Sequence, residues 1–396
     1  WYERPPEKWK VGGSTPPLAT TDGPPLWRTV CYVPPSIPSE RWRLIKYLGS
    51  KRVQVPVLGA IASAVQARTA LDLFTGTTRV AQEFKSRGIF TTAVDLATYS
   101  EVFAQCYIET DAAKVSSTEL ADALAQLNSL PGVPGYFTRT FCEEARFFQP
   151  KNGARIDAIR DALASDFATS PLYPILLTSL IEAADRVDST TGLQMAFLKS
   201  WAPRANADLE LRAPVLLAGD GKAIRGDALE VVEQLAGVDL AYLDPPYNQH
   251  RYFTNYHIWE TLVRWDQPAA YGVARKREDA RGASSRSRFN SKPEMPTALA
   301  QVIQGVSAKC VVVSYNNESW VSADQIAQSL RDSGHEYVSI VDFDYKRYVG
   351  AQIGIHNPAG ERVGKVSHLR NVEHVVIAGE RDRVEAAVAA ASATKN

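Results

Sequence analysis

The sequence predicts an α/β fold built on a doubly wound, mostly parallel sheet. Six β-like segments alternate with helical patterns, which is the signature of such a sheet. They cover residues 70–74, 91–95, 239–243, 310–315, 337–343 and 374–378. A chain of 396 residues with 45% hydrophobic content is also long enough to bury a large core. We therefore expect a sheet domain formed by residues 40–110 and 210–385.

The two ends and one internal stretch break this alternation. Residues 1–39 hold nine of the 23 prolines, which predicts an extended arm that is draped over the domain or disordered. Residues 386–396 are predicted to be a C-terminal tail after an alanine-rich helix. Between 111 and 209, Ile156, Ile159 and Leu163 recur at helical spacing, and a second apolar helix follows Pro174. This stretch is predicted to be a helical insertion.

Composition narrows the possible partners. The chain has 44 Lys and Arg and 44 Asp and Glu, so any contact with nucleic acid must come from local basic patches. The four cysteines form no CxxC pair, so we expect neither a metal site nor a disulfide framework, and a reducing cytoplasm as the compartment. No apolar run is long enough to span a membrane, and no secretory signal is evident.

The most informative short motif follows the third predicted strand. Asp244, Pro245, Pro246 and Tyr247 come directly after the apolar run 238–243. A carboxylate at the end of a parallel strand points into the crevice where open α/β sheets bind ligands. The two prolines remove backbone donors and leave carbonyl oxygens free, and Tyr247 adds a flat ring. This acceptor-rich elbow suits a planar ring that bears an amino group. The plainer alternative is a proline turn that only closes the strand.

A second motif predicts a nucleoside-like cofactor. The first strand runs into a tight turn at Phe74, Thr75, Gly76 and Thr77, and a helix is expected from Arg79 to Arg87, ended by Gly88. The third glycine of a dinucleotide fingerprint is missing, so a pyrophosphate ligand is disfavoured. Asp95 ends the next strand where a carboxylate commonly grips ribose, and Asp227 offers a further acid. S-adenosylmethionine, which has adenine and ribose but no phosphate, fits these terms.

Taken together, these motifs resemble adenine-specific DNA methyltransferases of the Dam-like type, over residues 42–378. The matching residues are Lys46 and Tyr47 of an upstream cofactor segment, Phe74 and Gly76, the ribose acid Asp95, the adenine-edge acid Asp227, the tetrapeptide Asp244 to Tyr247, and segments 256–260 and 314–316. Thr78 departs from the pattern, because the family often has a second glycine there. The insertion at 111–209 falls where the family has its target-recognition region.

The resemblance implies a mechanism and partners. A methyl group would pass from S-adenosylmethionine to the exocyclic amine of an adenine flipped out of double-stranded DNA. Asp244 and the Pro245 carbonyl would accept the hydrogens of that amine, and Tyr247 would stack on the base. Direct transfer needs no metal and no covalent enzyme intermediate. Whether a cognate restriction endonuclease accompanies the chain is left open.

Basic residues after the elbow are candidates for DNA contact. The stretch 275–292 is predicted to be a mobile basic loop, and 345–348 interleaves aromatic and basic side chains. The predicted DNA-contacting residues are Arg275, Lys276, Arg277, Arg286, Arg288, Lys346 and Arg347. For both segments the alternative is an ordinary solvated surface.

Two rival functions remain at this level. The same elbow serves enzymes that methylate guanine or adenine amines in ribosomal RNA. A catalytically silent DNA-binding protein on a methyltransferase fold is the other alternative. A cytosine-ring methyltransferase is disfavoured, because none of the cysteines follows a proline.

Overall fold

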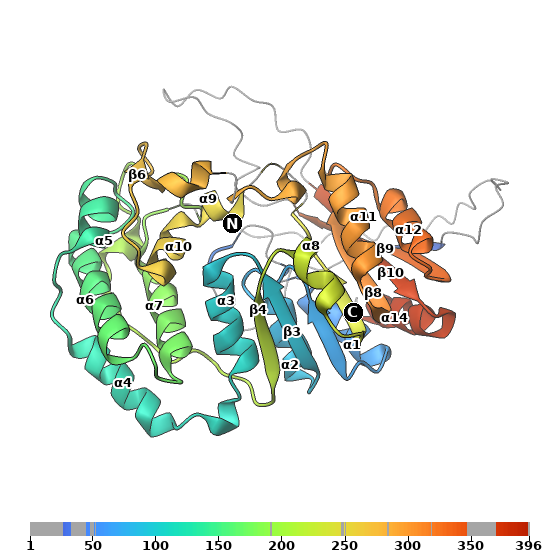
Figure 1. Cartoon of the computed structure of the whole chain (residues 1–396), viewed down its shortest axis with the longest axis horizontal. Coiled ribbons are helices and arrows are strands. Elements are labelled where there is room, and N and C mark those ends of the chain that lie inside the picture. Colours follow the sequence, from blue (N-terminus) through green and yellow to red (C-terminus); the bar gives the residue numbers. More distant parts are fainter. Residues whose placement is uncertain are drawn as a thin grey trace, which may run out of the picture.

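One large sheet organises the protein. The computed structural model describes residues 27–32, 45–47, 51, 53–190, 192–246, 249, 251–282, 285–317, 319–346 and 370–394. Within these ranges, eight strands form a sheet in the order β1-β9-β10-β8-β5-β2-β3-β4, shown in Figure 1. Strand β10 is antiparallel to both neighbours, whereas the other pairs are parallel. The predicted doubly wound, mostly parallel sheet is confirmed.

All six predicted strands are present. They are β2 Thr69–Asp72, β3 Phe90–Asp95, β5 Val238–Leu243, β8 Ala308–Asn316, β9 Tyr337–Lys346 and β10 Arg370–Gly379. Two strands were not predicted, namely β1 Trp27–Tyr32 and β4 Gly221–Arg225. Strand β1 lies inside the proline-rich arm and pairs in parallel with β9, so this part of the arm belongs to the sheet.

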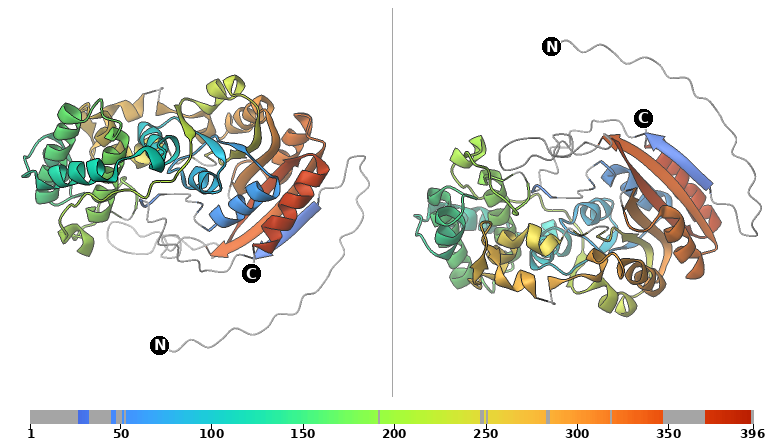
Figure 2. Two further views of the ribbon diagram at one scale, coloured as in Figure 1. Left: turned by 90° about the horizontal axis from the view of Figure 1, so that it is seen from below. Right: turned by 90° about the horizontal axis from the view of Figure 1, so that it is seen from above.

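Helices cover both faces of the sheet, as Figures 1 and 2 show. One face is covered by α1 Val55–Ala64, α2 Arg79–Ser86 and α14 Arg381–Ala393, which pack on Leu240 and Val312 among others. The other face is covered by α8 Ala228–Val231, α11 Met295–Gly305 and α12 Ala323–Asp332. Alternate strand residues therefore serve different cores, as the period of two in a strand requires.

The predicted C-terminal tail needs correction. Helix α14 continues through residue 393, and the side chains of Ala387 and Ala391 are fully buried against the sheet. Small alanine side chains allow the helix to lie close to the strands, so this segment is part of the core and does not fray from residue 386.

A second group of helices stands at the β4 end of the sheet (Figures 1 and 2). Residues 111–209 contain α4 Ser117–Ser129, α5 Tyr136–Thr138, α6 Pro150–Asp166 and α7 Tyr173–Val187. These helices share a hydrophobic core with α3 Thr98–Ala104 and α10 His257–Arg264. The two helical patterns read from the sequence correspond to α6 and α7.

One buried carboxylate fixes the start of α5. Asp157 of α6 is 1% exposed and accepts hydrogen bonds from the backbone N–H groups of Gly135, Phe137 and Thr138, at 2.8–2.9 Å. It also accepts one from the Thr138 hydroxyl at 2.6 Å. A carboxylate at a helix N-terminus satisfies amides that have no partner within the helix.

We expect Asp157→Ala to lower the free energy of unfolding by about 3 kcal/mol or more, because it leaves several buried donors without an acceptor. Denaturant unfolding followed by circular dichroism measures the change. Asp166→Ala is the matched control, since Asp166 is exposed near the end of the same helix. Equal stability losses in the two variants would contradict this account of Asp157.

Candidate active site

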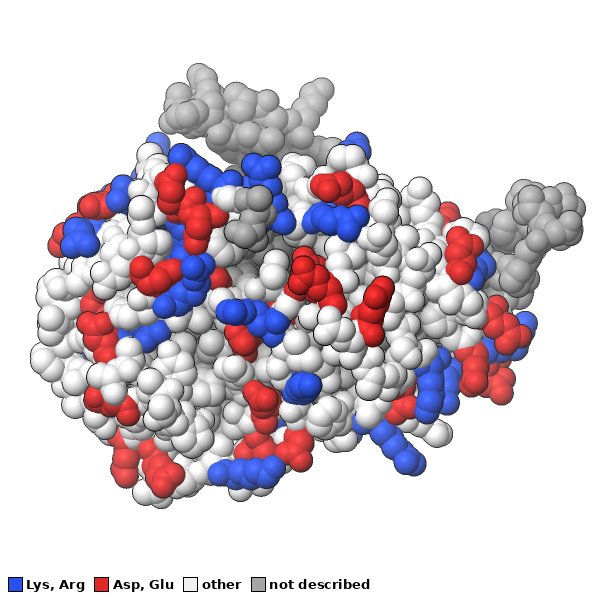
Figure 3. Space-filling model, in the orientation of Figure 1, with Lys and Arg blue, Asp and Glu red and all other residues white. Residues whose placement is uncertain are grey.

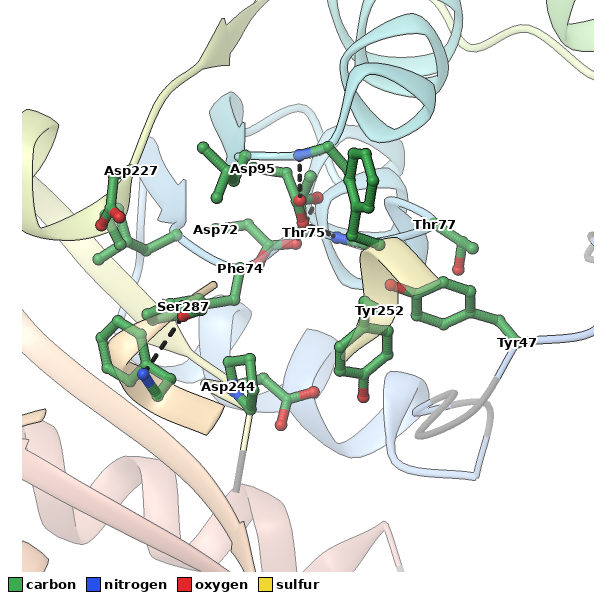
Figure 4. Close-up of a pocket in the computed structure, with 18 of the residues that line it drawn as sticks. Tyr47, Asp72, Phe74, Thr75, Thr77, Asp95, Asp227, Asp244, Tyr252 and Ser287 are labelled. Carbon is green, nitrogen blue, oxygen red and sulfur yellow. Dashed lines mark hydrogen bonds between the residues drawn. The ribbon is translucent and has the colours of Figure 1, made fainter. Parts of the chain in front are cut away.

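A pocket opens at the carboxyl edge of the sheet, where the strand order reverses between β2 and β5. Open α/β sheets bind ligands at this switch point, because the connecting loops diverge there. The pocket encloses about 1380 Å³ of empty space, open solvent at its mouth included. Figure 4 shows its walls, with Asp227 at one end, Tyr47 at the other and Asp72, Asp95 and Asp244 between them.

The glycine turn forms the floor of the pocket. Gly76 has φ +52°, and a Cβ at this position would lie 3.1 Å from the Tyr47 ring, so a larger residue would be both strained and crowded. Asp95 fixes the turn, because its carboxylate accepts hydrogen bonds from the N–H groups of Gly76 at 2.8 Å and Ala97 at 3.0 Å. Each carboxylate oxygen retains a second lone pair for a ligand hydroxyl.

Thr78 shows how the chain manages without the second glycine of the family pattern. Its backbone is left-handed, with φ +62°, a conformation that glycine adopts without strain. The side chain is fully buried, and its hydroxyl donates to the Thr77 carbonyl at 2.7 Å and accepts from Gln82 at 2.9 Å. These hydrogen bonds offset the backbone strain, so the turn persists.

Aromatic rings line the remaining walls. Tyr47 stacks on Tyr256 with centroids 4.7 Å apart and on Tyr252 with centroids 5.3 Å apart. On another wall, Phe74 meets the edge of Phe289 at 5.1 Å. Flat rings and carboxylates together suit a ligand that combines a purine with hydroxyl and amino groups.

Three aspartates end adjacent strands and crowd the pocket with negative charge. Burial and the neighbouring Asp244 and Asp95 carboxylates together raise the pKa of Asp72 to about 7, against a hydrogen bond from Thr75 that lowers it. Burial also raises the pKa of Asp95. The Oδ1 atom of Asp72 is buried and has no hydrogen-bond partner among the described residues. The pocket therefore favours a cationic ligand.

Asp244 has a cation beside it already. Burial raises its pKa to about 6, which the ammonium of Lys51 opposes and the carboxylate of Glu373 reinforces. The distance from Lys51 Nζ to Asp244 Oδ1 is 3.0 Å. With its pKa near 6, Asp244 is mostly ionised at neutral pH and able to accept a hydrogen bond.

Most residues expected from the sequence to bind a cofactor line this pocket. Tyr47, Phe74, Thr75, Gly76, Thr77, Asp95 and Asp227 do so, together with Asp244 and Pro246. Asp227 also caps α8 by accepting a hydrogen bond from Leu229 N–H at 2.9 Å. Pro245 is buried directly after Asp244. Tyr247 lies outside the described residues.

The prediction that Lys46 binds the cofactor needs correction. Lys46 does not line the pocket, and its ammonium instead lies 2.9 Å from Asp188 Oδ1 and donates to the Asp185 carbonyl at 2.7 Å, at the end of α7. Lys51, five residues further on, is the lysine of this segment that reaches the pocket.

The sequence reasoning gave no role to several other pocket residues. They are Lys51, Asp72, Arg79, Arg251, Tyr252, Ser287 and Phe289. Asp72 could have been predicted from the sequence, because it ends its strand as Asp95 does, and Asp244 directly follows its own strand. The others are brought to the pocket by tertiary contacts that leave no local pattern.

The basic stretch 275–292 is more ordered than expected, since it contains strand β7 Lys276–Arg277 and the short helix η9 Arg288–Asn290. The prediction that Arg277 contacts DNA is wrong. Its guanidinium is 1% exposed and forms ion pairs with Asp266 at 2.6 Å and Asp279 at 2.8 Å. A buried, fully paired guanidinium stabilises the fold and is not available to a phosphate.

The other predicted basic contacts differ in their surroundings. Arg275 pairs with Glu144 at 2.5 Å, and Arg288 donates to Gln301 at 2.9 Å. Arg286 is exposed and lines a second, shallower pocket. Lys346 ends β9, but its side chain and Arg347 lie outside the described residues.

Neither a membrane-crossing helix nor a metal cluster is found in the part of the chain that the structure describes. No helix there is long and apolar enough to cross a membrane. No group of three or more His, Cys, Asp or Glu side chains within those ranges could hold a metal ion. His257 is a core residue, with Nε2 2.9 Å from the Gln194 carbonyl and a pKa lowered by burial to about 3.

The sheet and its acid-lined pocket define an S-adenosylmethionine-dependent methyltransferase. A family model, D12 class N6 adenine-specific DNA methyltransferase, matches residues 47–327. The match covers the glycine turn, the three aspartates and the helical segment. The chain belongs to this family of DNA methyltransferases, which act on the N6 amine of adenine.

Among curated proteins, several modification enzymes are similar. Modification methylase StsI of Streptococcus sanguinis is 29% identical over 77% of this chain and 49% of that protein. Type II methyltransferase M.NlaIII of Neisseria lactamica is 28% identical over 77% of this chain and 92% of that protein. Type II methyltransferase M.FokI of Planomicrobium okeanokoites is 32% identical over 52% of this chain and 32% of that protein. The chain thus spans about half of StsI.

Among solved structures, a putative methyltransferase from Streptococcus mutans, described as dependent on S-adenosylmethionine, aligns with 84% of this chain and 50% of that chain. The identity is 11% and the TM-score 0.32.

The pocket fits S-adenosylmethionine. This cofactor carries a sulfonium and an amine, and the unpartnered Oδ1 of Asp72 is a buried acceptor in the wall of the pocket. Asp95 and Asp227 would hold its hydroxyl and amino groups, and the aromatic walls its purine.

We expect cofactor binding to strengthen as pH rises from 6 to 8, because Asp72 ionises through its pKa of about 7 and its charged form attracts a cation. Asp72→Asn should bind about tenfold more weakly at pH 8 and lose this dependence. Titration calorimetry measures both. Binding by Asp72→Asn that matched the wild type at pH 8 would exclude this role for Asp72.

Proposed function

We propose that this chain methylates the N6 amine of adenine in double-stranded DNA. The observation that carries the proposal is the position of Asp244, which directly follows β5 and lines the same pocket as Gly76 and Asp95. Family membership over residues 47–327 supports adenine in DNA as the target over an amine in ribosomal RNA. An intact, ionisable Asp244 beside a formed pocket speaks against a catalytically silent protein.

Asp244 and Pro245 would act on the target amine. When bound, S-adenosylmethionine supplies an electrophilic methyl group. The amine is a poor nucleophile, because its lone pair is delocalised into the adenine ring. The Asp244 carboxylate and the Pro245 carbonyl would accept its two hydrogens, which favours a pyramidal nitrogen with its lone pair free to attack.

The base must leave the DNA stack to reach this carboxylate. Extrusion costs a few kcal/mol, which contacts to the base and the backbone must offset. We propose that Tyr247 stacks on the extruded adenine and that Pro246, which lines the pocket, fixes the turn beneath it.

Two aspartates should separate chemistry from cofactor binding. Asp244→Ala should reduce methyl transfer by a factor of at least about 10² while leaving cofactor affinity largely intact, because its contacts are made to the amine. Asp95→Ala should instead weaken cofactor binding first, because it frees the Gly76 turn. Radiolabel transfer to duplex DNA and titration calorimetry measure the two effects.

Asp220→Ala is the control, since this side chain is 67% exposed and pairs with Lys114 far from the pocket. Near-normal turnover by Asp244→Ala would refute the assigned chemistry. Transfer to structured RNA, with none to duplex DNA, would favour the ribosomal RNA alternative.

We propose that DNA lies across the second pocket. This surface includes Met195, Arg251, Tyr271, Arg281 and Arg286, and it adjoins the first pocket at Arg251, which lines both. The Arg281 guanidinium lies over the Tyr271 ring at 3.8 Å, which holds a charged group at the surface. Figure 3 shows several Lys and Arg side chains, with Asp and Glu among them, along the upper part of the view.

The neighbouring elements suit a duplex as well. A hairpin formed by β6 Ala270–Tyr271 and β7 ends in Val273, which is 80% exposed. Arg275 and Lys276 follow that tip in the sequence. We propose that both contact DNA, together with Arg286, Arg288, Lys346 and Arg347. We propose that the helical segment 111–209 supplies target recognition, since it stands beside this surface in Figure 1.

Removing charge here should weaken DNA binding. We expect Arg281→Ala/Arg286→Ala to lower affinity for duplex DNA and to reduce the salt dependence of binding by about one to two in the slope of log K against log salt. Fluorescence anisotropy at several salt concentrations measures both. Lys309→Ala, a 62% exposed lysine at the opposite end of the sheet, is the control. If Lys309→Ala lost as much affinity for duplex DNA as the double variant, the DNA-binding surface would lie elsewhere.

The relatives' names bear on partners. StsI is named a modification methylase and M.NlaIII a Type II methyltransferase, and we propose on this basis that this chain pairs with a cognate restriction endonuclease. We propose a cytoplasmic location, in keeping with Cys106, Cys142 and Cys310, which are buried as free thiols.

A further inference from the structure

Lys51 lies between two carboxylates at the edge of the active site. Its ammonium is 3.0 Å from Asp244 Oδ1 and is hydrogen-bonded to Glu373 Oε1. The Lys51 and Glu373 side chains are only 9% and 3% exposed. Neither Lys51 nor Glu373 belongs to the elbow or to the glycine turn, so the contact joins the elbow to a distant part of the chain.

The antiparallel strand makes this arrangement possible. Because β10 runs opposite to its neighbours, its beginning lies at the same edge as the ends of β5 and β8, and Glu373 pairs in register with Asn316 near the end of β8. Glu373 shares a face with Val375 and Ile377, the face that α1 covers. Lys51 precedes α1 and therefore reaches Asp244 and Glu373 from that side.

We propose that Glu373 is a positioning residue for Asp244, acting through Lys51: it holds the lysine on Oδ1 of the catalytic carboxylate and so directs Oδ2 to the target amine. The inference rests on the proposed function of Asp244. Glu373 touches neither substrate nor cofactor in this arrangement, and its effect passes through the lysine.

Charge balance gives the arrangement its chemical consequence. Without Lys51, Asp244 and Glu373 would be two carboxylates facing one another in a buried place, and one would bind a proton. Without Glu373, the Lys51 ammonium would pair more strongly with Asp244 and compete with the target amine for its carboxylate. Among the residues that the structure describes, the other titratable groups that interact with Asp244 are Asp72 on β2 and the Tyr242 phenol on β5.

The pH dependence of methyl transfer tests the proposal, because a purely structural tie would not move it. Measured for duplex DNA at saturating cofactor, the acidic limb of kcat/KM reports ionisation of the enzyme before DNA binds, apart from the effect of Asp72 on cofactor binding. Glu373→Gln removes a negative charge and should move this limb to lower pH, whereas Lys51→Met removes a positive charge and should move it to higher pH. We expect shifts of about one pH unit in each direction.

The double variant Lys51→Met/Glu373→Gln should bring the limb back between those of the two single variants. Lys51→Arg retains the charge and should stay near the wild type. Lys309→Met is the matched control, since Lys309 pairs with Asp239 at 2.8 Å near the other end of β5, and it should leave the limb unchanged. Thermal melting and cofactor titration establish that each variant is folded.

Shifts of the two single variants in the same direction, or none in either, would overturn the positioning role. If Glu373→Gln fails to fold, the comparison of Lys51→Met with Lys51→Arg decides, because only loss of charge should move the limb. Failure of the proposed function is distinguishable, since the wild type itself would then transfer no methyl group to adenine in duplex DNA.

Discussion

The site depends on the crowding of carboxylates where parallel strands end. Strands β2, β3 and β5 are neighbours, and Asp72, Asp95 and Asp244 end or follow them at one edge. Burial raises the pKa of all three. Each carboxylate must therefore be stabilised by a hydrogen-bond donor or a cation. The partner differs among the three, and so does the role that each carboxylate can have.

The three aspartates are satisfied in three ways. Backbone amides of Gly76 and Ala97 solvate Asp95, which makes it part of the turn. Lys51 balances Asp244 while leaving it able to accept hydrogen bonds. Asp72 receives only the Thr75 hydroxyl on one oxygen, among the described residues, and so retains the greatest demand for a cation. On the proposed function, one arrangement of strands would supply Asp95 to the ribose, Asp244 to the target amine and Asp72 to the sulfonium.

The sequence could predict only those features of the site that depend on a local pattern of residues. Gly76, Asp95 and Asp244 follow apolar runs, so their place at the strand ends was predictable. Glu373 was not, because its role depends on β10 being antiparallel, which no local pattern records. The prediction that Arg277 contacts DNA failed for a similar reason. A run of basic residues does not reveal which guanidinium is buried between Asp266 and Asp279.

The glycine turn is also tied to the helical segment through rings. Trp259, Tyr256 and Tyr47 form a continuous stack with centroids 4.7 Å apart at each step and interplanar angles of 4° and 16°. Tyr256 and Trp259 belong to the core that contains α4 to α7, and Tyr47 lies against Gly76. Stacked rings resist sliding because they are packed on both faces. The packing of the helical segment therefore fixes the wall of the pocket that Tyr47 and Gly76 form.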